Sequence, residues 1–421
     1  MEREYTLGSG VKVYGYKNPA LHGFYISLFV KAGSLYESEE ENGITHFLEH
    51  IAIRNVNAIR NGRLYLELDE HGIDFNASTY SEMVQFYVSG AKENFTFASS
   101  VLTDILSPII LPSSEIEAER KRIRAEIREG DDKSSLVNFT SGIVFEGTPL
   151  SRQITGSAKT VSRITKSRLE EYRKKVFCSN NIFFYVTGNF TDDDIHALSS
   201  MIDAHSLPIG EARDNIAPVP EHFGKRGGAV HIKNADFTMA RFTFDLDMSK
   251  MTMPEVDLIY DILLSGYSSD FFIELSEKRG LFYDISGSSE RYKNIGALAF
   301  TFELKPGKLY EAVDVTVGIL KELKTKLLPE NKCMKAGYVA NANILFDDFR
   351  ELNFTFAYDN HIMELGYSDI SERKQAYKNV TPERLRELAG EIFRPENLTF
   401  TLKGNKKTID TERLRSIIAS L

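Results

Sequence analysis

The spacing of hydrophobic and polar positions along the chain predicts both strands and helices. Residues 24–31 and 240–246 read as strands, and residues 182–186 and 398–402 are rich in the β-branched and aromatic side chains that strands favour. Residues 113–128 instead repeat apolar positions at helical spacing between charged ones, and this is the clearest helix in the first half. Strands and helices mixed in this way predict an α+β fold.

The pattern occurs twice along the chain. Two stretches match at one constant offset, since 381 − 165 = 216, and each reads as a capped helix, a turn at Asn, a strand and a Gly-Asn turn. The matching positions are Thr165, Arg168, Leu169, Glu171, Phe177, Asn181, Gly188 and Asn189, followed by Thr381, Arg384, Leu385, Glu387, Phe393, Asn397, Gly404 and Asn405. Eight identities without a gap indicate a duplication.

Two homologous α/β-roll domains in tandem, each an antiparallel sheet flanked by helices, are therefore predicted. The first domain spans residues 1–205 and the second spans residues 229–421. Residues 206–228 contain three prolines and four glycines, which interrupt both periodicities and predict a linker. Two halves folded back on each other would enclose a cleft.

Composition narrows the possible functions. The net charge of −9 argues against a general affinity for nucleic acid, and no apolar run approaches the ~20 residues of a membrane span. The two cysteines, Cys178 and Cys333, are too few for a disulfide framework. The first residues lack the basic-then-apolar order of a signal peptide, so a cytoplasmic location is expected.

The segment Gly43–Ile51 contains the pattern His-x-x-Glu-His. On a helix, His46 and His50 are four residues apart and share a face, so both can bind one metal ion. Glu49 lies near that face and can reach a water on the metal without being a ligand. A catalytic zinc site needs a third protein ligand and one open position.

The third ligand is expected to be a carboxylate from a second helix. The predicted helix at 113–128 carries four glutamates, Glu115, Glu117, Glu119 and Glu126. Glu119 and Glu126 are seven residues apart and share a face. The residues alone do not choose between them.

The combined pattern resembles the pitrilysin, insulysin and mitochondrial processing peptidase family of metallopeptidases. In that family a glutamate about 76 residues after the second histidine is the third ligand, and 126 − 50 = 76 places Glu126 there. The resemblance implies that Glu119, seven residues earlier, supports the site. It also implies one Zn²⁺ per chain, held by His46, His50 and Glu126, with Glu49 as the catalytic base.

Segments outside the motif resemble the same family. Gly33-Ser34-x-x-Glu37 matches a segment before the motif, and Asn76, Ala77 and Ser78, with Thr79, match the edge strand on which substrates add as an extra strand. The resemblance therefore implies peptide binding at Asn76, Ala77 and Ser78.

A second substrate contact is implied in the second half, where Tyr283 ends a Gly-Leu-x-Tyr segment. Many family members carry an arginine seven residues earlier, but Ser276 stands at that place here. Either Arg279 substitutes for the missing arginine or another subunit supplies it. The chain length, about half that of the insulysin type, implies a homodimer or heterodimer closing around a chamber.

Other candidates are set aside. His361 and Glu364 form a His-x-x-Glu pattern without a second histidine and are interpreted as a chance match. Neither cysteine is interpreted as a nucleophile. Adding 216 to the three ligand positions gives Ile262, Gly266 and Ala342, none of which can bind metal. The second half is therefore predicted to be structural and to hold substrate.

We therefore expect a zinc-dependent endopeptidase or oligopeptidase that hydrolyses unfolded peptides inside a dimeric chamber. One alternative is a dedicated maturation peptidase for a precursor or bacteriocin-type peptide, working with a homologous partner subunit. Another is a non-catalytic structural subunit of a peptidase-like complex. Retention of three ligands and a base argues against the last.

Overall fold

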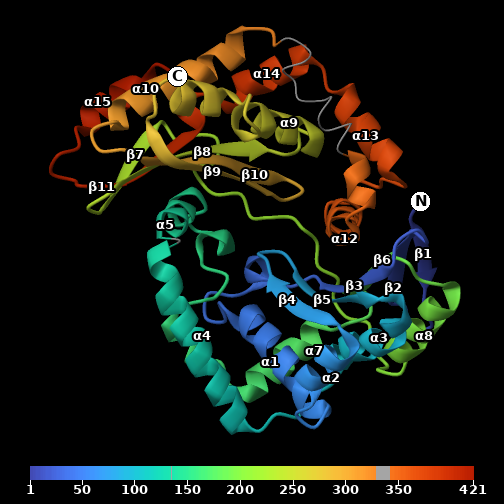
Figure 1. Ribbon diagram of the computed structural model, residues 1–421. Helices are drawn as coiled ribbons and strands as arrows, with labels where there is room; N and C mark the ends of the chain where they lie inside the picture. Colours follow the sequence, from blue (N-terminus) through green and yellow to red (C-terminus); the bar gives the residue numbers. More distant parts are fainter. Residues whose placement is uncertain (134, 329–341) are drawn as a thin grey trace. The chain divides into compact units, whose positions relative to one another are not determined.

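The computed structural model describes residues 1–133, 135–328 and 342–421, which form two compact units (Figure 1). The first unit comprises Met1–Lys133, Arg152–Asn215 and Asn343–Ile370, and the second comprises Ser134–Ser151, Ile216–Ala342 and Ser371–Leu421. The boundary at 215/216 falls inside the predicted linker, but each unit also takes a segment from the other half. The boundaries of the predicted sequence domains remain a prediction. Cys333 lies outside the described residues.

The first unit is built on a six-stranded sheet in the order β1-β2-β6-β3-β5-β4. Its strands are β1 (Arg3–Thr6), β2 (Lys12–Lys17), β3 (Gly23–Val30), β4 (Asp74–Thr79), β5 (Val84–Ala91) and β6 (Ile182–Gly188). Neighbouring strands are antiparallel except for β2 and β6, which are parallel. The predicted strand at 24–31 is β3, and β6 contains the predicted strand at 182–186.

Helices cover one face of this sheet, and the hydrophobic core lies between the two layers. Phe24, Ile26 and Leu28 of β3 point into that core. The unit contains the helices α1 (Ile44–Ile59), α2 (Leu64–His71), α3 (Phe95–Thr103), α4 (Ser113–Lys133), α6 (Ala158–Val161), α7 (Lys166–Val176) and α8 (Asp192–Asp203), of which α1 and α3 contact the strands and α4 contacts α1. The helix predicted at 113–128 is therefore confirmed, and it continues for another turn.

The second unit repeats this plan with one strand fewer. Its sheet has the order β7-β11-β8-β10-β9, again with one parallel pair, β7 with β11. Its strands are β7 (Ala229–Asn234), β8 (Thr238–Asp247), β9 (Phe282–Arg291), β10 (Ile295–Leu304) and β11 (Leu398–Gly404). Its helices include α5 (Ser135–Val144), α9 (Met253–Leu264), α10 (Leu309–Thr325), α13 (Ile370–Asn379), α14 (Pro382–Ile392) and α15 (Thr411–Ala419). The predicted fold of two related α/β domains is confirmed.

The duplicated sequence forms the same local structure in both units. Thr165 caps α7 by accepting from the Arg168 N–H at 3.2 Å, and Thr381 caps α14 in the same way at 3.1 Å from Arg384. Each cap satisfies a backbone donor that the first turn leaves open. After each helix a buried asparagine, Asn181 or Asn397, donates to the carbonyl five residues before it.

One helix covers the opposite, more polar face of each sheet. Helix α12 (Phe349–Ala357) packs on β3 and β6, although it follows α10 in the chain. Its fully buried Asn353 accepts from Ser27 at 2.7 Å and donates to the Tyr185 carbonyl at 2.9 Å. Helix α5 packs on β8 and β11, where the hydroxyls of Thr140 and Thr401 lie 2.6 Å apart. The two halves of the sequence thus exchange a helical segment.

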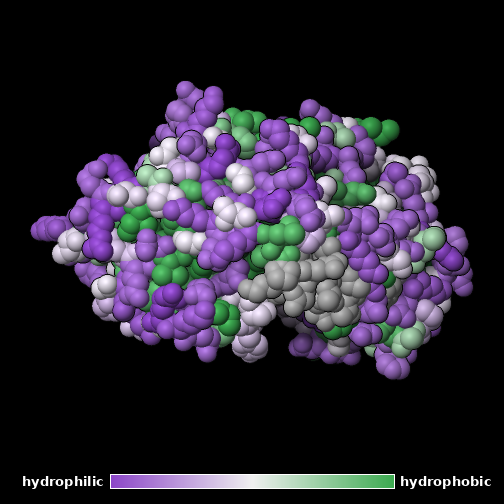
Figure 2. Space-filling view, turned by 90° about the horizontal axis from the view of Figure 1, so that it is seen from above, coloured by the Kyte–Doolittle hydropathy of each residue, from purple (hydrophilic) through white to green (hydrophobic). Residues whose placement is uncertain are grey.

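The surface turned toward the viewer in Figure 2 is mostly hydrophilic, with small separate hydrophobic areas. Some large hydrophobic side chains, such as Ile209 and Tyr267, are exposed, which is usual for a folded protein. Within the described residues, none of the helices has the length and apolar character that crossing a bilayer requires.

Candidate metal centre

The motif helix α1 begins at a position fixed by a distant carboxylate. Gly43 precedes the helix with φ of 92°, and Glu37 accepts hydrogen bonds from the backbone N–H groups of Gly43 at 2.8 Å and Thr45 at 2.9 Å. A carboxylate at this place accepts hydrogen bonds from N–H groups that the first turn leaves unpaired. Its negative charge also interacts favourably with the positive end of the helix dipole. A Cβ on Gly43 would lie 2.8 Å from the Cα of Gly156, so only glycine fits. The helix start is therefore fixed on both sides.

His46 and His50 lie on one face of α1, as predicted. Both belong to the first two turns, and their ring centroids are 4.6 Å apart. His46 is buried, and burial together with the nearby His50 lowers the pKa of His46 to about 4. A neutral imidazole is the form that binds metal, so the lowered pKa favours His46 as a ligand.

Helix α4 brings Glu126 to the two histidines. One Glu126 oxygen lies 3.5 Å from His46 Nε2, and the other lies 3.6 Å from His50 Nε2. Two ligand atoms held tetrahedrally at about 2.1 Å from zinc are about 3.4 Å apart. The three side chains, whose ligand atoms all lie within 4.8 Å of one another, therefore fit a zinc ion and leave one position open.

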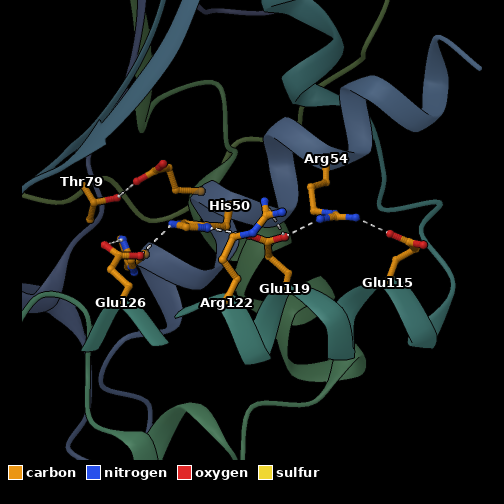
Figure 3. A network of polar contacts seen from close by, with 9 residues as sticks. His50, Arg54, Thr79, Glu115, Glu119, Arg122 and Glu126 are labelled. Atoms are coloured by element: carbon orange, nitrogen blue, oxygen red, sulfur yellow. Dashed lines mark hydrogen bonds and ion pairs between the residues drawn. The ribbon is translucent and has the colours of Figure 1, made fainter. Parts of the chain in front are cut away.

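Glu119, which like Glu126 belongs to α4, orients His50. Its Oε1 lies 2.8 Å from His50 Nδ1, and its side chain is only 2% exposed (Figure 3). A carboxylate here requires the proton on Nδ1, which leaves Nε2 free to bind metal. Burial acts to lower the pKa of His50, but the bond to Glu119 and the surrounding carboxylates outweigh burial and raise it. The two predicted glutamates thus take different positions, one beside both Nε2 atoms and the other behind one ring.

Glu49 is held beside the histidines by the edge strand β4. The Thr79 hydroxyl donates to Glu49 Oε2 at 2.7 Å, and Glu49 is 8% exposed. Burial raises the pKa of Glu49, and the bond from Thr79 only partly opposes this. A carboxylate with a raised pKa is a stronger base, as proton transfer from water requires.

Asn76, Ala77 and Ser78 lie on β4, at the edge of the first sheet. In the described residues β4 pairs only with β5, so its outer backbone groups face away from the sheet. Asn76 is exposed and uses its side chain to accept from the Ala77 N–H at 2.9 Å. The strand that carries the predicted substrate residues therefore also carries Thr79, which contacts the predicted base.

Tyr283 and Arg279 belong to the second unit. Tyr283 lies on the edge strand β9, is 65% exposed, and has the Lys305 ammonium 5.8 Å from its ring centroid. Arg279 forms an ion pair with Glu274 at 2.6 Å. Ser276 lies in the same short helical segment as Glu274, Phe272–Glu277. A role of Tyr283 or Arg279 beside the metal ligands remains a prediction.

The pattern set aside as a chance match has a structural role. The ring of His361 stacks on Tyr14 with centroids 3.5 Å apart, and its Nε2 lies 3.3 Å from a Glu2 oxygen. Glu364 follows the end of the helical segment with φ of 59°, so it does not share a helix face with His361. Cys178 is buried, and burial raises the pKa of its thiol, which opposes a nucleophilic role.

Sequence reasoning missed two residues that support the metal centre, Glu37 and Arg54. The cap made by Glu37 was not foreseen, although the residue belongs to a noted segment. Arg54, four residues after His50, also escaped notice. It bonds to Glu119 at 2.7 Å and to Glu115 at 2.5 Å. The spacing of His46, His50 and Arg54 at four-residue steps is the signal that could have revealed it.

Comparison with known proteins agrees with this geometry. Residues 13–158 match the family described as Insulinase (Peptidase family M16), and residues 163–336 match the Peptidase M16 inactive domain. The chain belongs to the M16 family of metallopeptidases.

Among its relatives, an uncharacterized zinc protease of Rickettsia felis is 28% identical over 327 residues, which is 76% of each chain. A probable mitochondrial-processing peptidase subunit beta of Schizosaccharomyces pombe is 29% identical over 51% of this chain and 47% of its own. A structure of a putative M16-like peptidase from Alicyclobacillus acidocaldarius has a TM-score of 0.82 at 17% identity, covering 96% of this chain and 98% of that one. Peptidase function and zinc as the cofactor are supported by these relatives.

Proposed function

We propose that the protein is a zinc-dependent endopeptidase or oligopeptidase that cleaves unfolded peptides. The observation that carries this proposal is the convergence of His46, His50 and Glu126, with ligand atoms within 4.8 Å of one another, beside the buried Glu49. These residues would hold one zinc ion per chain. The family relationship supports the same function.

Zinc bound here supplies Lewis acidity, which polarises a carbonyl and makes a water molecule more acidic. Glu49 takes the proton of the attacking water, and its carboxylate is aimed by the Thr79 hydroxyl at 2.7 Å. The same carboxyl group then gives the proton to the leaving amine. Glu119 keeps the proton of His50 on Nδ1 throughout, since Glu119 Oε1 lies 2.8 Å from His50 Nδ1.

The edge strand β4 would bind substrate as an additional strand. Its backbone groups bind any extended peptide, and alternate side chains choose among sequences. This requirement for an extended backbone favours unfolded peptides over folded proteins. Asn76, Ala77 and Ser78 would contact the peptide, and Tyr283 is proposed as a further substrate-holding residue.

The test is to incubate the purified protein with a peptide mixture and to map cleavage sites by mass spectrometry. Cleavage within peptides, lost on zinc chelation and restored by added zinc, is expected. A protein that binds one zinc ion per chain and cleaves no peptide in the mixture, alone or with a homologous partner, would contradict the proposal.

A second candidate is a dedicated maturation peptidase that works with a homologous partner chain, as a homodimer or heterodimer in the cytoplasm. The ion pair between Arg279 and Glu274 favours this candidate, because it occupies the arginine that would have to replace the one missing at Ser276. A partner would then supply that arginine. A neighbouring gene for a second chain of this family, beside a gene for a small precursor peptide, would support it.

A non-catalytic structural role is the least supported alternative. Such a subunit has no need for three converging ligands, a hydrogen-bonded base and an oriented imidazole. The measurement that decides is zinc content beside peptide cleavage.

A further inference from the structure

We propose that Arg54 is a positioning residue of the metal centre, acting through Glu119 on His50. This inference rests on the proposed zinc function. Arg54 is not among the converging ligands, and its guanidinium contacts Glu119 and Glu115. It lies one turn beyond His50 on the same face of α1.

The contacts between α1 and α4 form a ladder of polar pairs (Figure 3). As α1 runs from His46 through His50 to Arg54, its partners on α4 run back from Glu126 through Glu119 to Glu115. The distances are 3.5 Å for His46 to Glu126, 2.8 Å for His50 to Glu119, and 2.5 Å for Arg54 to Glu115. The metal ligands form one end of this ladder, and Arg54 closes the other.

Glu119 links the two ends because each of its oxygens has a different partner. Oε1 contacts His50 Nδ1 and Oε2 contacts an Nη atom of Arg54 at 2.7 Å. A carboxylate held at both oxygens cannot rotate about its last bond, so Arg54 fixes the direction in which Glu119 accepts from His50. The other Nη atom of Arg54 contacts Glu115, which fixes the guanidinium itself.

Among the described residues, Glu119 is the side chain that bonds to an imidazole Nδ1 of the two histidines. The Nδ1 atom of His46 is buried and has no hydrogen-bond partner among them. The orientation of His50 therefore depends on Glu119. A carboxylate that is only 2% exposed also needs a nearby cation, and Arg54 supplies one.

The chain contains a matched control. Arg122 also approaches Glu119 Oε2, but at 3.5 Å and with its side chain 68% exposed, whereas Arg54 is 28% exposed. Both arginines give the same positive charge near one oxygen atom. Of the two, Arg54 has the short contact to Glu119 and is itself held by a second carboxylate, Glu115. If Arg54 acts by positioning Glu119, replacing Arg54 should weaken zinc binding more than replacing Arg122, whereas a general effect of charge should make the two replacements equal.

The experiment measures zinc dissociation constants of the full-length protein by competition with a chelator, for the wild type and for Arg54→Met, Arg54→Lys, Arg122→Met and Glu126→Gln. Arg54→Met is expected to weaken zinc binding ~10-fold, the lower end for residues that orient a ligand. Arg54→Lys should recover part of this loss, since it keeps the charge but not the two-pronged contact. Arg122→Met should change binding less than ~2-fold, as exposed ion pairs do.

The absorption spectrum of the cobalt-substituted protein gives a second reading, because it reports ligand geometry. It should change for Arg54→Met and stay unchanged for Arg122→Met. If Arg54→Met does not fold, Glu115→Gln replaces it, with a smaller loss expected in the same direction.

Equal zinc affinity of Arg54→Met and wild type, or an equal loss for the two arginine variants, would overturn the proposal. Failure of the proposed function gives a different result, in which the wild type binds no zinc or Glu126→Gln binds it as tightly as the wild type.

Discussion

The two units of this protein share the order of five strands and the same capped helix before the last strand, but they differ at the helix that follows β3 in the first unit and β8 in the second. In the first unit that helix, α1, carries His46 and His50. In the second it is α9, where the position 216 residues after His46 is Ile262, a buried core residue. The positions corresponding to His50 and Glu126 are Gly266, beyond the end of α9, and Ala342. None of the three can bind a metal.

The N-terminal caps of α1 and α9 also differ between the two units. Helix α9 is capped locally, with the Thr252 N–H bonded to Glu255 at 2.7 Å. Helix α1 is capped by Glu37 from a preceding segment. A local cap suffices where a helix only fills a core, whereas a cap from another segment also fixes the place of the helix against its neighbours. Fold and chemistry are thus separable in one chain.

The difference between the two units is tested most strongly by removing the proposed base from the first unit. Glu49→Gln should lower peptide cleavage ~10²–10⁴-fold while zinc content stays at the wild-type level, because Glu49 is not a ligand. Metal analysis beside a peptide assay checks both. Cleavage by this variant within ~3-fold of wild type would remove Glu49 from the mechanism.

The second unit can be tested by giving it the residue it lacks. If a missing cation near the substrate carbonyl limits the solitary chain, Ser276→Arg should raise its rate ~10²–10³-fold, the usual effect of one such donor. A homologous partner that carries this arginine should give a similar gain to the wild type. Strong activity of the wild-type chain alone, unaffected by Ser276→Arg, would show that no partner is required.

The ligand assignment is sharpened by comparing two glutamates on one helix. Glu126→Gln should weaken zinc binding ~100-fold or more, because an amide replaces an anionic ligand. Glu119→Gln should weaken it ~10–100-fold through His50. Zinc competition titrations give both values. A larger loss for Glu119→Gln than for Glu126→Gln would reverse the two roles.

The smallest expected effect tests what the units share. Thr165→Ala and Thr381→Ala should each lower the free energy of unfolding by ~1 kcal/mol, since each removes a helix cap with the same geometry. Urea unfolding followed by circular dichroism measures this, with the Ser variants as controls that keep the hydroxyl. A cost for one threonine alone would show that the duplicated caps are no longer equivalent.

Local patterns predicted much of this molecule. Strands at 24–31 and 240–246 are observed as Gly23–Val30 and Thr238–Asp247, because apolar and aromatic runs of that length favour strands wherever they pack. His46 and His50 converge because helix geometry sets their spacing. The choice of Glu126 over Glu119, by contrast, came from family spacing and not from the residues.

What escaped prediction depends on contacts between distant segments. The apolar positions of α12 indicate a helix but not the sheet that it covers, which is set by partners such as Ser27 and Asn353, 326 residues apart. The parallel pairing of β2 with β6 depends on the path of the whole chain. Arg54 looked like an ordinary charged residue of a helix, because its carboxylate partners lie on another helix.

The exchanged helices also bear on how the chain is made. The last strand of the first sheet, β6, ends at Gly188, yet the helix that covers its polar face starts only at Phe349. On the ribosome the Asn353 partners on β3 and β6 remain uncovered until that segment emerges. A fragment ending at Asn215 would leave those polar groups without their buried asparagine. The two units are therefore expected to complete their folding together, late in synthesis.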